Sequence, residues 1–131
     1  MVDVPDHALV IRGGDPHDPR QLPRMIGQAQ LAYDRGLGYS LSTFAGADQD
    51  LCKDDLIKQI AAVHPIPNRQ LAVTTAGLLR AIGCVLVSDR RLPSHVRVTL
   101  GSEPDPDRVQ AFIDVFGPAE GNPMYEETRR R

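Results

Sequence analysis

The sequence predicts one small α/β domain around a five-stranded mixed sheet, in the order βαβαβαββα, with an α+β arrangement as the alternative. Three observations lead to this fold class. The chain has 131 residues, close to the commonest size of a single domain. Its 41% hydrophobic and 24% charged residues are typical of a globular protein. Short apolar runs alternate with helical patterns, which favours a sheet that contains parallel strand pairs.

The first predicted strand covers residues 7–12, a short apolar run that stops at a Gly-Gly pair. A helix is then expected to begin at Pro19, with Asp18 as its N-cap, and to end at Gly36. Its apolar residues recur at helical spacing, and those expected to be buried are Leu22, Met25, Ile26, Ala29 and Tyr33.

The second strand is expected over residues 39–44, where polar and less polar side chains alternate. The helix after it is expected to be capped by Asp48 or Asp50 and to reach about residue 62. Its acidic first turns suit the positive end of the helix dipole. The stripe expected to be buried on this helix is Cys52, Leu56, Ile60 and Val63.

Four short elements are predicted in the next third of the chain. A third strand covers residues 70–74, and a short helix over 76–82 follows with Thr75 as its cap. The fourth and fifth strands, 84–88 and 95–100, are separated by a turn and are expected to pair as a hairpin.

The last helix has the clearest signals. Asp105 is its expected cap and Pro106 its first residue, and the apolar positions that follow at helical spacing are Val109, Phe112, Ile113 and Phe116. The domain is therefore predicted over residues 1–117. Residues 118–131, which end in three arginines, are expected to form an extended, disordered tail.

The charges are unevenly distributed along the chain, although the net charge is only −2. Four aspartates lie between residues 48 and 55. The arginines of the following segment are Arg69, Arg80, Arg90, Arg91 and Arg97. One acidic and one basic face would follow, and two ordinary solvated surfaces are the alternative. Nucleic-acid binding through these arginines is the weakest of the partner hypotheses, because the chain is acidic overall and aromatic residues are not interleaved with them.

The remaining composition indicates a cytoplasmic protein. Cys52 and Cys84 are expected to be buried, reduced thiols, because each has apolar neighbours. The first residues lack the apolar segment of a signal peptide, and no apolar run reaches the ~18 residues of a membrane span. Arginine far outnumbers lysine, which indicates a bacterial source.

The first candidate site is Arg12 with Gly13 and Gly14, at the end of the first strand. Ligands of open α/β sheets bind at such strand ends, and a Gly-Gly pair lets a phosphate approach the backbone. The alternative is a tight turn with Arg12 in a surface ion pair.

Two further candidates lie nearby in the sequence. Alternation places the hydroxyls of Ser40 and Ser42 on the same side of the second strand, where they could brace a ligand or simply face solvent. Residues 15–18 contain two carboxylates and a histidine, but no further ligand at metal-binding spacing, so a loop with a capping aspartate is favoured over a metal site.

Two histidines form the fourth candidate. His7 and His95 each begin a predicted strand, and neighbouring strands would let their rings act as acid and base, as in RNA-cleaving enzymes. Arg97, on the same face as His95, would then suit a phosphate. Partly exposed polar residues without a catalytic role are the alternative.

The segments Arg12-Gly13, Gly36-Leu-Gly38-Tyr39 and Ser40-x-Ser42, within residues 7–62, resemble the minimal ADP-ribosyltransferase plan. The resemblance implies that Arg12 contacts the phosphates or ribose of NAD, with Gly13, Gly14 and Tyr39 also at the cofactor, and that the serine strand braces its nicotinamide end. The strand that begins at His95 is also similar to a strand of RNA 2′-phosphotransferases. The catalytic glutamate of the transferases has no counterpart in any predicted strand.

Two function classes follow from these features. The first is a small enzyme-like bacterial effector, such as the toxin of a toxin–antitoxin pair, that acts on NAD or RNA through Arg12, Ser40, Ser42 and His95. The second is a non-catalytic protein-binding module of the antitoxin, immunity or adaptor type, which uses the acidic helix or the basic segment. Both classes imply a cognate protein partner, and a homodimer stays open.

Overall fold

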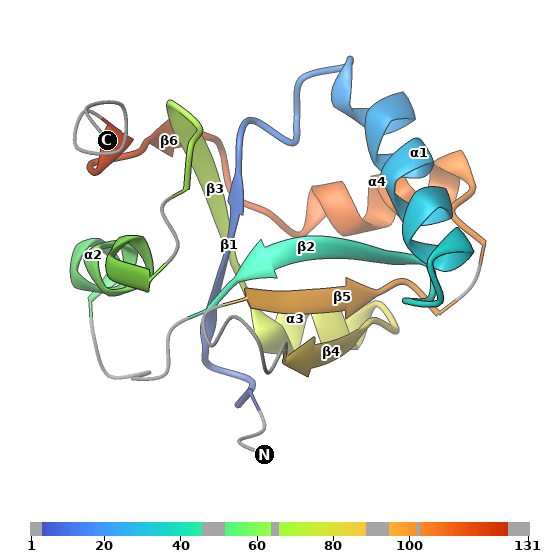
Figure 1. The fold of residues 1–131 in the computed structure, drawn as a ribbon, viewed down its shortest axis with the longest axis horizontal. Helices are drawn as coiled ribbons and strands as arrows, with labels where there is room; N and C mark the ends of the chain where they lie inside the picture. Colours follow the sequence, from blue (N-terminus) through green and yellow to red (C-terminus); the bar gives the residue numbers. More distant parts are fainter. Residues whose placement is uncertain (1–3, 46–51, 64–65, 89–94, 102, 126–131) are drawn as a thin grey trace.

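The computed structural model describes residues 4–45, 52–63, 66–88, 95–101 and 103–125 (Figure 1). Within these ranges, strands and helices follow one another nearly as the sequence predicts. In chain order they are β1 (Leu9–Gly13), α1 (Gln21–Asp34), β2 (Ser40–Phe44), α2 (Lys53–Val63), β3 (Gln70–Thr75), α3 (Ala76–Ala81), β4 (Val85–Ser88), β5 (His95–Thr99), α4 (Pro106–Asp114) and β6 (Glu120–Gly121). The domain is thus a mixed α/β domain.

The strands form one six-stranded sheet in the order β4-β5-β2-β1-β3-β6, and every pairing is antiparallel. The predicted five-stranded mixed sheet with parallel pairs is therefore wrong, while the predicted hairpin of β4 and β5 is confirmed. The physical reason lies in the connections. The segment that carries α1 joins two antiparallel neighbours, β1 and β2, so it returns to the end of the sheet that it left. It does not cross over to the opposite end, as a parallel pair would need.

The sixth strand comes from the segment after α4. Glu120–Gly121 pair with the first two residues of β3, and the buried Asn122 amide donates to the carbonyls of Ile66 and Asn68. A two-residue strand has no periodicity that could be detected in a sequence, and this is why the predicted element order lacked it. Residues 126–131 lie outside the described part of the chain, so a disordered tail there stays a prediction.

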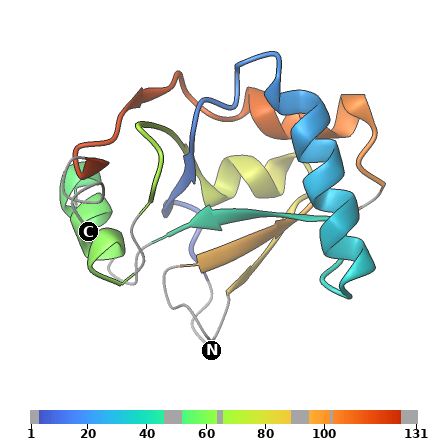
Figure 2. The same cartoon turned by 45° about the horizontal axis from the view of Figure 1, so that its top comes forward.

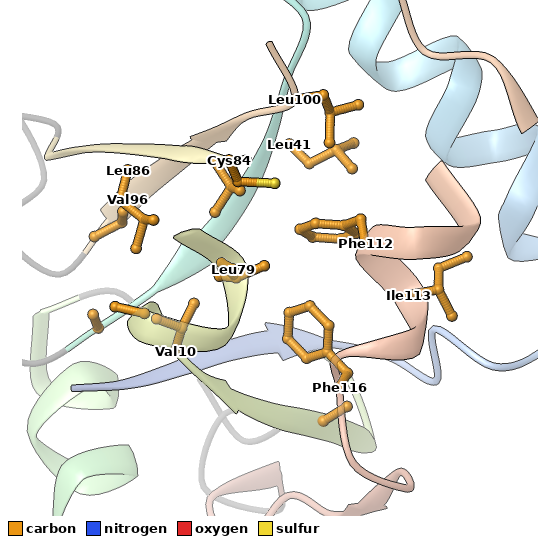
Figure 3. Close-up of a cluster of buried hydrophobic side chains, with 14 of the residues drawn as sticks. Val10, Leu41, Leu79, Cys84, Leu86, Val96, Leu100, Phe112, Ile113 and Phe116 are labelled. Atoms are coloured by element: carbon orange, nitrogen blue, oxygen red, sulfur yellow. The ribbon is translucent and has the colours of Figure 1, made fainter. Parts of the chain in front are cut away.

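The two faces of the sheet carry separate hydrophobic clusters. On one face, α1, α3 and α4 cover a large cluster that includes Val10, Leu41, Leu79, Phe112 and Phe116 (Figure 3). On the other, α2 covers a smaller cluster of Ile11, Leu56, Ile57, Ile60, Ile66 and Leu71. Successive strand residues point to opposite faces, so neighbours such as Val10 and Ile11 fall in different clusters. In Figures 1 and 2, α2 stands at one end of the molecule and α1 at the other.

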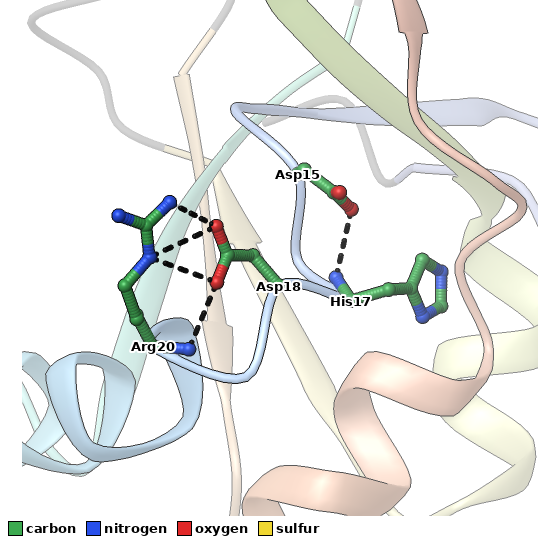
Figure 4. Close-up of polar contacts among 4 residues, drawn as sticks. All are labelled: Asp15, His17, Asp18 and Arg20. Atoms are coloured by element: carbon green, nitrogen blue, oxygen red, sulfur yellow. Dashed lines mark hydrogen bonds and ion pairs between the residues drawn. The ribbon is translucent and has the colours of Figure 1, made fainter.

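Two of the predicted helix caps are confirmed and one is wrong. Asp105 accepts a hydrogen bond from the Arg108 backbone N–H at 2.7 Å, and Thr75 accepts one from Leu78 at 3.3 Å. Helix α1 instead begins at Gln21, and its N-cap residue makes no side-chain cap bond. Asp18 pairs with the Arg20 guanidinium at 2.6 Å (Figure 4), and hydrogen bonds from Arg20 lower the pKa of Asp18 to about 2.

Two side chains expected to be buried are exposed. Tyr33 is 51% exposed and stacks on Tyr39, with ring centroids 4.2 Å apart, while Ala32 takes the buried position of α1. Cys52 is exposed because it lies one residue before α2 and outside the buried stripe of that helix, which begins at Leu56, and its thiol donates to Asp55. Cys84 is buried as predicted, and burial raises the pKa of its thiol. Asp48 and Asp50, the expected caps of α2, lie outside the described residues.

The Asp105 cap gives a first testable prediction. Asp105→Ala is expected to lower the free energy of unfolding by about 1 kcal/mol, because the Arg108 N–H loses its acceptor at the start of α4. Urea denaturation measures the change. Asp107→Ala is the matched control, since Asp107 lies in the same turn and makes no cap bond. Equal losses in the two variants would contradict a specific role for the cap.

Candidate functional site

A pocket of about 510 Å³ lies between α1, the strands β2 and β5, and the segment before β3. Arginines and neutral polar residues form most of its wall. The arginines are Arg12, Arg24, Arg35 and Arg97, and the neutral polar residues are Gln21, Gln28, Ser40, Ser42 and Asn68. Gly13, Gly14, Leu31, Ala32, Leu37, Leu41, Phe44 and Pro67 complete the lining. Most of the residues that the sequence singles out around Arg12 therefore meet in one place.

The sheet face that α2 covers provides the floor of this pocket. Over β1 and β3 that face is apolar and packs on α2, whereas over β2 and β5 it carries Ser42 and Arg97, which are paired in register. Phe44 marks the border, because it packs against the α2 cluster and also lines the pocket. Helix α1 supplies a side wall, and the residues that it contributes at a spacing of three or four are Gln21, Arg24, Gln28, Leu31 and Arg35.

Arg12 lies where β1 and β2 separate. A single register pair, Ile11 with Phe44, joins these strands before they diverge (Figure 1). The half-buried Arg12 guanidinium bridges the gap beyond that pair, donating to the Ser42 carbonyl and to Gln28 Oε1, both at 2.8 Å. Burial lowers the pKa of Arg12 to about 10, so the side chain stays positively charged at neutral pH.

Arg97 is held by the first residue of β2. Its guanidinium donates to Ser40 Oγ at 3.2 Å, and the Ser40 hydroxyl donates to the Leu37 carbonyl at 3.1 Å. Ser40 is buried, so its role in the pocket is to position Arg97. The Ser42 hydroxyl is half-buried and forms no hydrogen bond with another described residue, which leaves it available to a ligand.

The Gly-Gly pair serves close packing with Asn68. A Cβ on Gly13 would lie 2.2 Å from Asn68 Oδ1, so the Asn68 amide occupies the space that a side chain at position 13 would need. Gly14 has a φ of +90°, a conformation that side chains rarely adopt. Its N–H donates to the Gln70 carbonyl at 2.8 Å, so this backbone group is already engaged by β3.

The pocket is strongly positive in a chain whose net charge is −2. Among the described residues that line it, none is an aspartate, a glutamate or a histidine. In the part of the chain that the structure describes, no ion pair involves any of the four pocket arginines. An anion that enters would therefore meet arginines that form no ion pair with a described carboxylate, and the low-dielectric walls would strengthen the attraction.

His95 and Tyr39 do not line the pocket. The His95 ring is buried and contacts Phe44 edge-on at 5.9 Å, and Phe44 rather than His95 faces the cavity. Strand β2 lies between β1 and β5, so the neighbouring strands needed for an acid–base pair of His7 and His95 do not occur. Tyr39 is instead engaged in its stack on Tyr33.

The predicted basic segment makes separate local contacts. Arg69 lies 5.5 Å from the centre of the Tyr125 ring, Arg80 pairs with Asp6 at 2.6 Å, and Arg97 enters the pocket. Arg90 and Arg91 are outside the described residues. On the acidic helix, Asp54 and Asp55 are exposed in the first turn of α2.

Residues 15–18 anchor the loop before α1 (Figure 4). Asp15 accepts a hydrogen bond from the His17 backbone N–H at 3.0 Å. His17 Nε2 lies 3.1 and 3.0 Å from the carbonyl oxygens of Phe116 and Gly117. Among the described residues, no group of three His, Cys, Asp or Glu side chains is arranged to hold a metal ion.

Sequence reasoning missed the contribution of α1 to this site. Arg24, Gln28, Leu31 and Arg35 follow one another at helical spacing beside the buried stripe of the same helix. That spacing is a detectable signal, but a charged flank next to an apolar stripe is also typical of any surface helix. Only the position of β2 and β5 relative to α1 turns this flank into a pocket wall.

Comparison of the chain with protein-family models, with curated proteins and with solved structures found no match in any of the three. The resemblance to ADP-ribosyltransferases therefore stays a prediction. None of the described helices is both long and apolar enough to span a membrane. Any assignment of function has to start from the pocket itself.

Proposed function

We propose that this chain is a small enzyme-like bacterial effector that binds NAD, with the phosphates of NAD held by the arginine pocket. The observation that carries the proposal is the pair of guanidiniums, Arg12 and Arg97, each of which donates a hydrogen bond to a residue of the second strand. Both line a pocket whose described lining residues include no carboxylate.

The chemistry of these side chains favours phosphate. Each guanidinium has about five N–H donors in a planar fork that matches phosphate oxygens. The described hydrogen bonds use two N–H donors of Arg12 and one of Arg97. The remaining N–H donors of both guanidiniums can therefore bind a ligand. The Ser42 hydroxyl adds a further donor beside them. These residues therefore fit the pyrophosphate of a dinucleotide.

The distribution of charge favours a small nucleotide over an RNA strand. Arg69 and Arg80 are engaged elsewhere, and the net charge of −2 gives no general attraction for a polyanion. The pocket volume of about 510 Å³ lies in the range of small-molecule sites. The proposal assigns Arg12 and Arg97 to binding and Ser40 to positioning Arg97, and it assigns no residue to proton transfer.

Titration calorimetry at low salt tests the proposal. NAD and a short single-stranded RNA are titrated into the wild-type protein and into Arg97→Gln, and NAD consumption is followed by chromatography. We expect NAD to bind and Arg97→Gln to weaken its affinity about tenfold, since one charged hydrogen-bonding group is lost. Arg20→Gln, which removes an exposed arginine paired with Asp18, serves as the control and should leave the affinity unchanged.

Two other outcomes of this titration would contradict NAD as the ligand. Tighter binding of the RNA than of NAD would replace NAD by RNA as the ligand. Absence of binding to both would overturn the proposal and favour the protein-binding module.

A specific observation supports the protein-binding module as the second candidate function: β4 is an edge strand, and its residues Val85 and Val87 are exposed. Edge strands of this kind pair readily with a strand of another chain.

A further inference from the structure

We infer that Leu31 and Leu37 bind the base of the nucleotide, so that the pocket selects a nucleoside diphosphate over phosphate compounds without a base. This inference rests on the proposed function and names the part of the ligand that the arginines do not explain. It assigns a role to the two exposed leucines that line the pocket.

The two leucines are exposed on the pocket wall. Leu31 is 48% exposed and Leu37 is 45% exposed, and both line the cavity. Large apolar side chains that stay half in water are ordinary when they are scattered singly. Here two of them line the same pocket as four arginines and several neutral polar side chains. An apolar ligand surface placed between them would remove both from water.

The turn at the end of α1 fixes this pair. The Leu37 N–H donates to the Ala32 carbonyl at 2.9 Å, the Gly36 N–H donates to the Tyr33 carbonyl at 2.9 Å, and Gly36 has a φ of +80°. This is the Schellman pattern, in which the residue after the glycine packs near the last turn of the helix. The position of Leu37 beside Leu31 is therefore set before a ligand arrives, which lowers the cost of ordering the site.

The leucines adjoin both arginines that the proposed function assigns to phosphate. The hydroxyl of Ser40 links the Leu37 carbonyl to the Arg97 guanidinium. On the other side, Gln28 accepts from Arg12 and lies three residues before Leu31, a rise of about 4.5 Å along the helix. The apolar pair and the two cations are thus near enough for one ligand to reach both. A nucleotide has this layout, with a flat apolar base joined through ribose to phosphates.

Calorimetric titration with ADP and with inorganic pyrophosphate separates the two halves of the site. The variants are Leu31→Gln and Leu37→Gln, and the matched control is Leu78→Gln, which replaces a leucine that is 51% exposed on α3 and does not line the pocket. We expect each pocket variant to weaken ADP binding about tenfold, the effect of losing roughly half the burial of a leucine side chain. Pyrophosphate affinity should not change, and the control should bind both ligands as the wild-type protein does.

The results separate failure of the inference from failure of the proposed function. If wild-type protein binds pyrophosphate as tightly as ADP, or if a pocket variant loses both ligands equally, the base site is wrong and the phosphate site stands. If wild-type protein binds neither ligand, the proposed function fails together with the inference. Tighter binding of ADP than of pyrophosphate, reduced only by the two pocket variants, supports both.

Discussion

Phe112→Ala is expected to lower the free energy of unfolding by about 3–5 kcal/mol, the largest effect on stability that we expect from a single change. The Phe112 ring is fully buried in the larger cluster and contacts Phe116, with ring centroids 5.1 Å apart (Figure 3). Its removal leaves a cavity that the sheet on one side and α4 on the other cannot close. Small domains are stable by about 5–15 kcal/mol, so the variant should be close to unfolding.

Urea denaturation followed by circular dichroism measures this loss. Val87→Ala is the control, because Val87 is exposed on the edge strand and its truncation should change the free energy of unfolding by no more than about 0.5 kcal/mol. A loss below about 1 kcal/mol in Phe112→Ala would contradict the packing between α4 and the sheet.

Arg12→Met is expected to weaken NAD binding about 100-fold, the largest effect that we expect on ligand affinity. The change removes a cation from the pocket and leaves the Ser42 carbonyl and Gln28 without their donor. A hydrogen bond to a charged group contributes about 1.5–3 kcal/mol, and about 2.7 kcal/mol corresponds to a 100-fold change in affinity. The same calorimetric titration with NAD measures it.

Two further variants show whether the loss of NAD affinity comes from the charge of Arg12 or from its hydrogen-bonding geometry. Arg12→Lys keeps the charge but cannot hold both partners with one planar group, so we expect it to recover only part of the affinity. Arg24→Met removes an exposed pocket arginine for which the structure describes no side-chain hydrogen bond, and a smaller loss is expected. If Arg12→Met folds normally and binds NAD as the wild-type protein does, the role assigned to Arg12 is wrong.

The fold could be predicted wherever the signal is local. Asp105, Pro106 and the apolar repeat after them define α4, and Thr75 caps α3, because these contacts join residues a few positions apart. The direction of strand pairing, in contrast, does not depend on local contacts. An alternation of strands and helices is compatible with both parallel and antiparallel pairing, and the choice depends on where each connection ends in space.

The candidate site could be predicted in part for the same reason. Arg12 and the serines of β2 lie at strand ends, which sequence patterns can locate. Their contacts span 30 residues for Arg12 with Ser42 and 57 for Arg97 with Ser40, so no local pattern connects them. The position of His95 at the start of a strand predicts a site residue, but in the fold its register partner Phe44 lines the cavity and His95 does not.

The seam between β1 and β2 divides the sheet into two leaves of three strands each, β4-β5-β2 and β1-β3-β6. The larger hydrophobic cluster packs across both leaves, but the strands themselves are joined by a single register pair and by the Arg12 side chain beside the pocket. Backbone pairing between the leaves is therefore sparse beside Arg12, whereas the strands within each leaf are paired over more residues. An anion bound to Arg12 would therefore sit where the two leaves share the least backbone pairing.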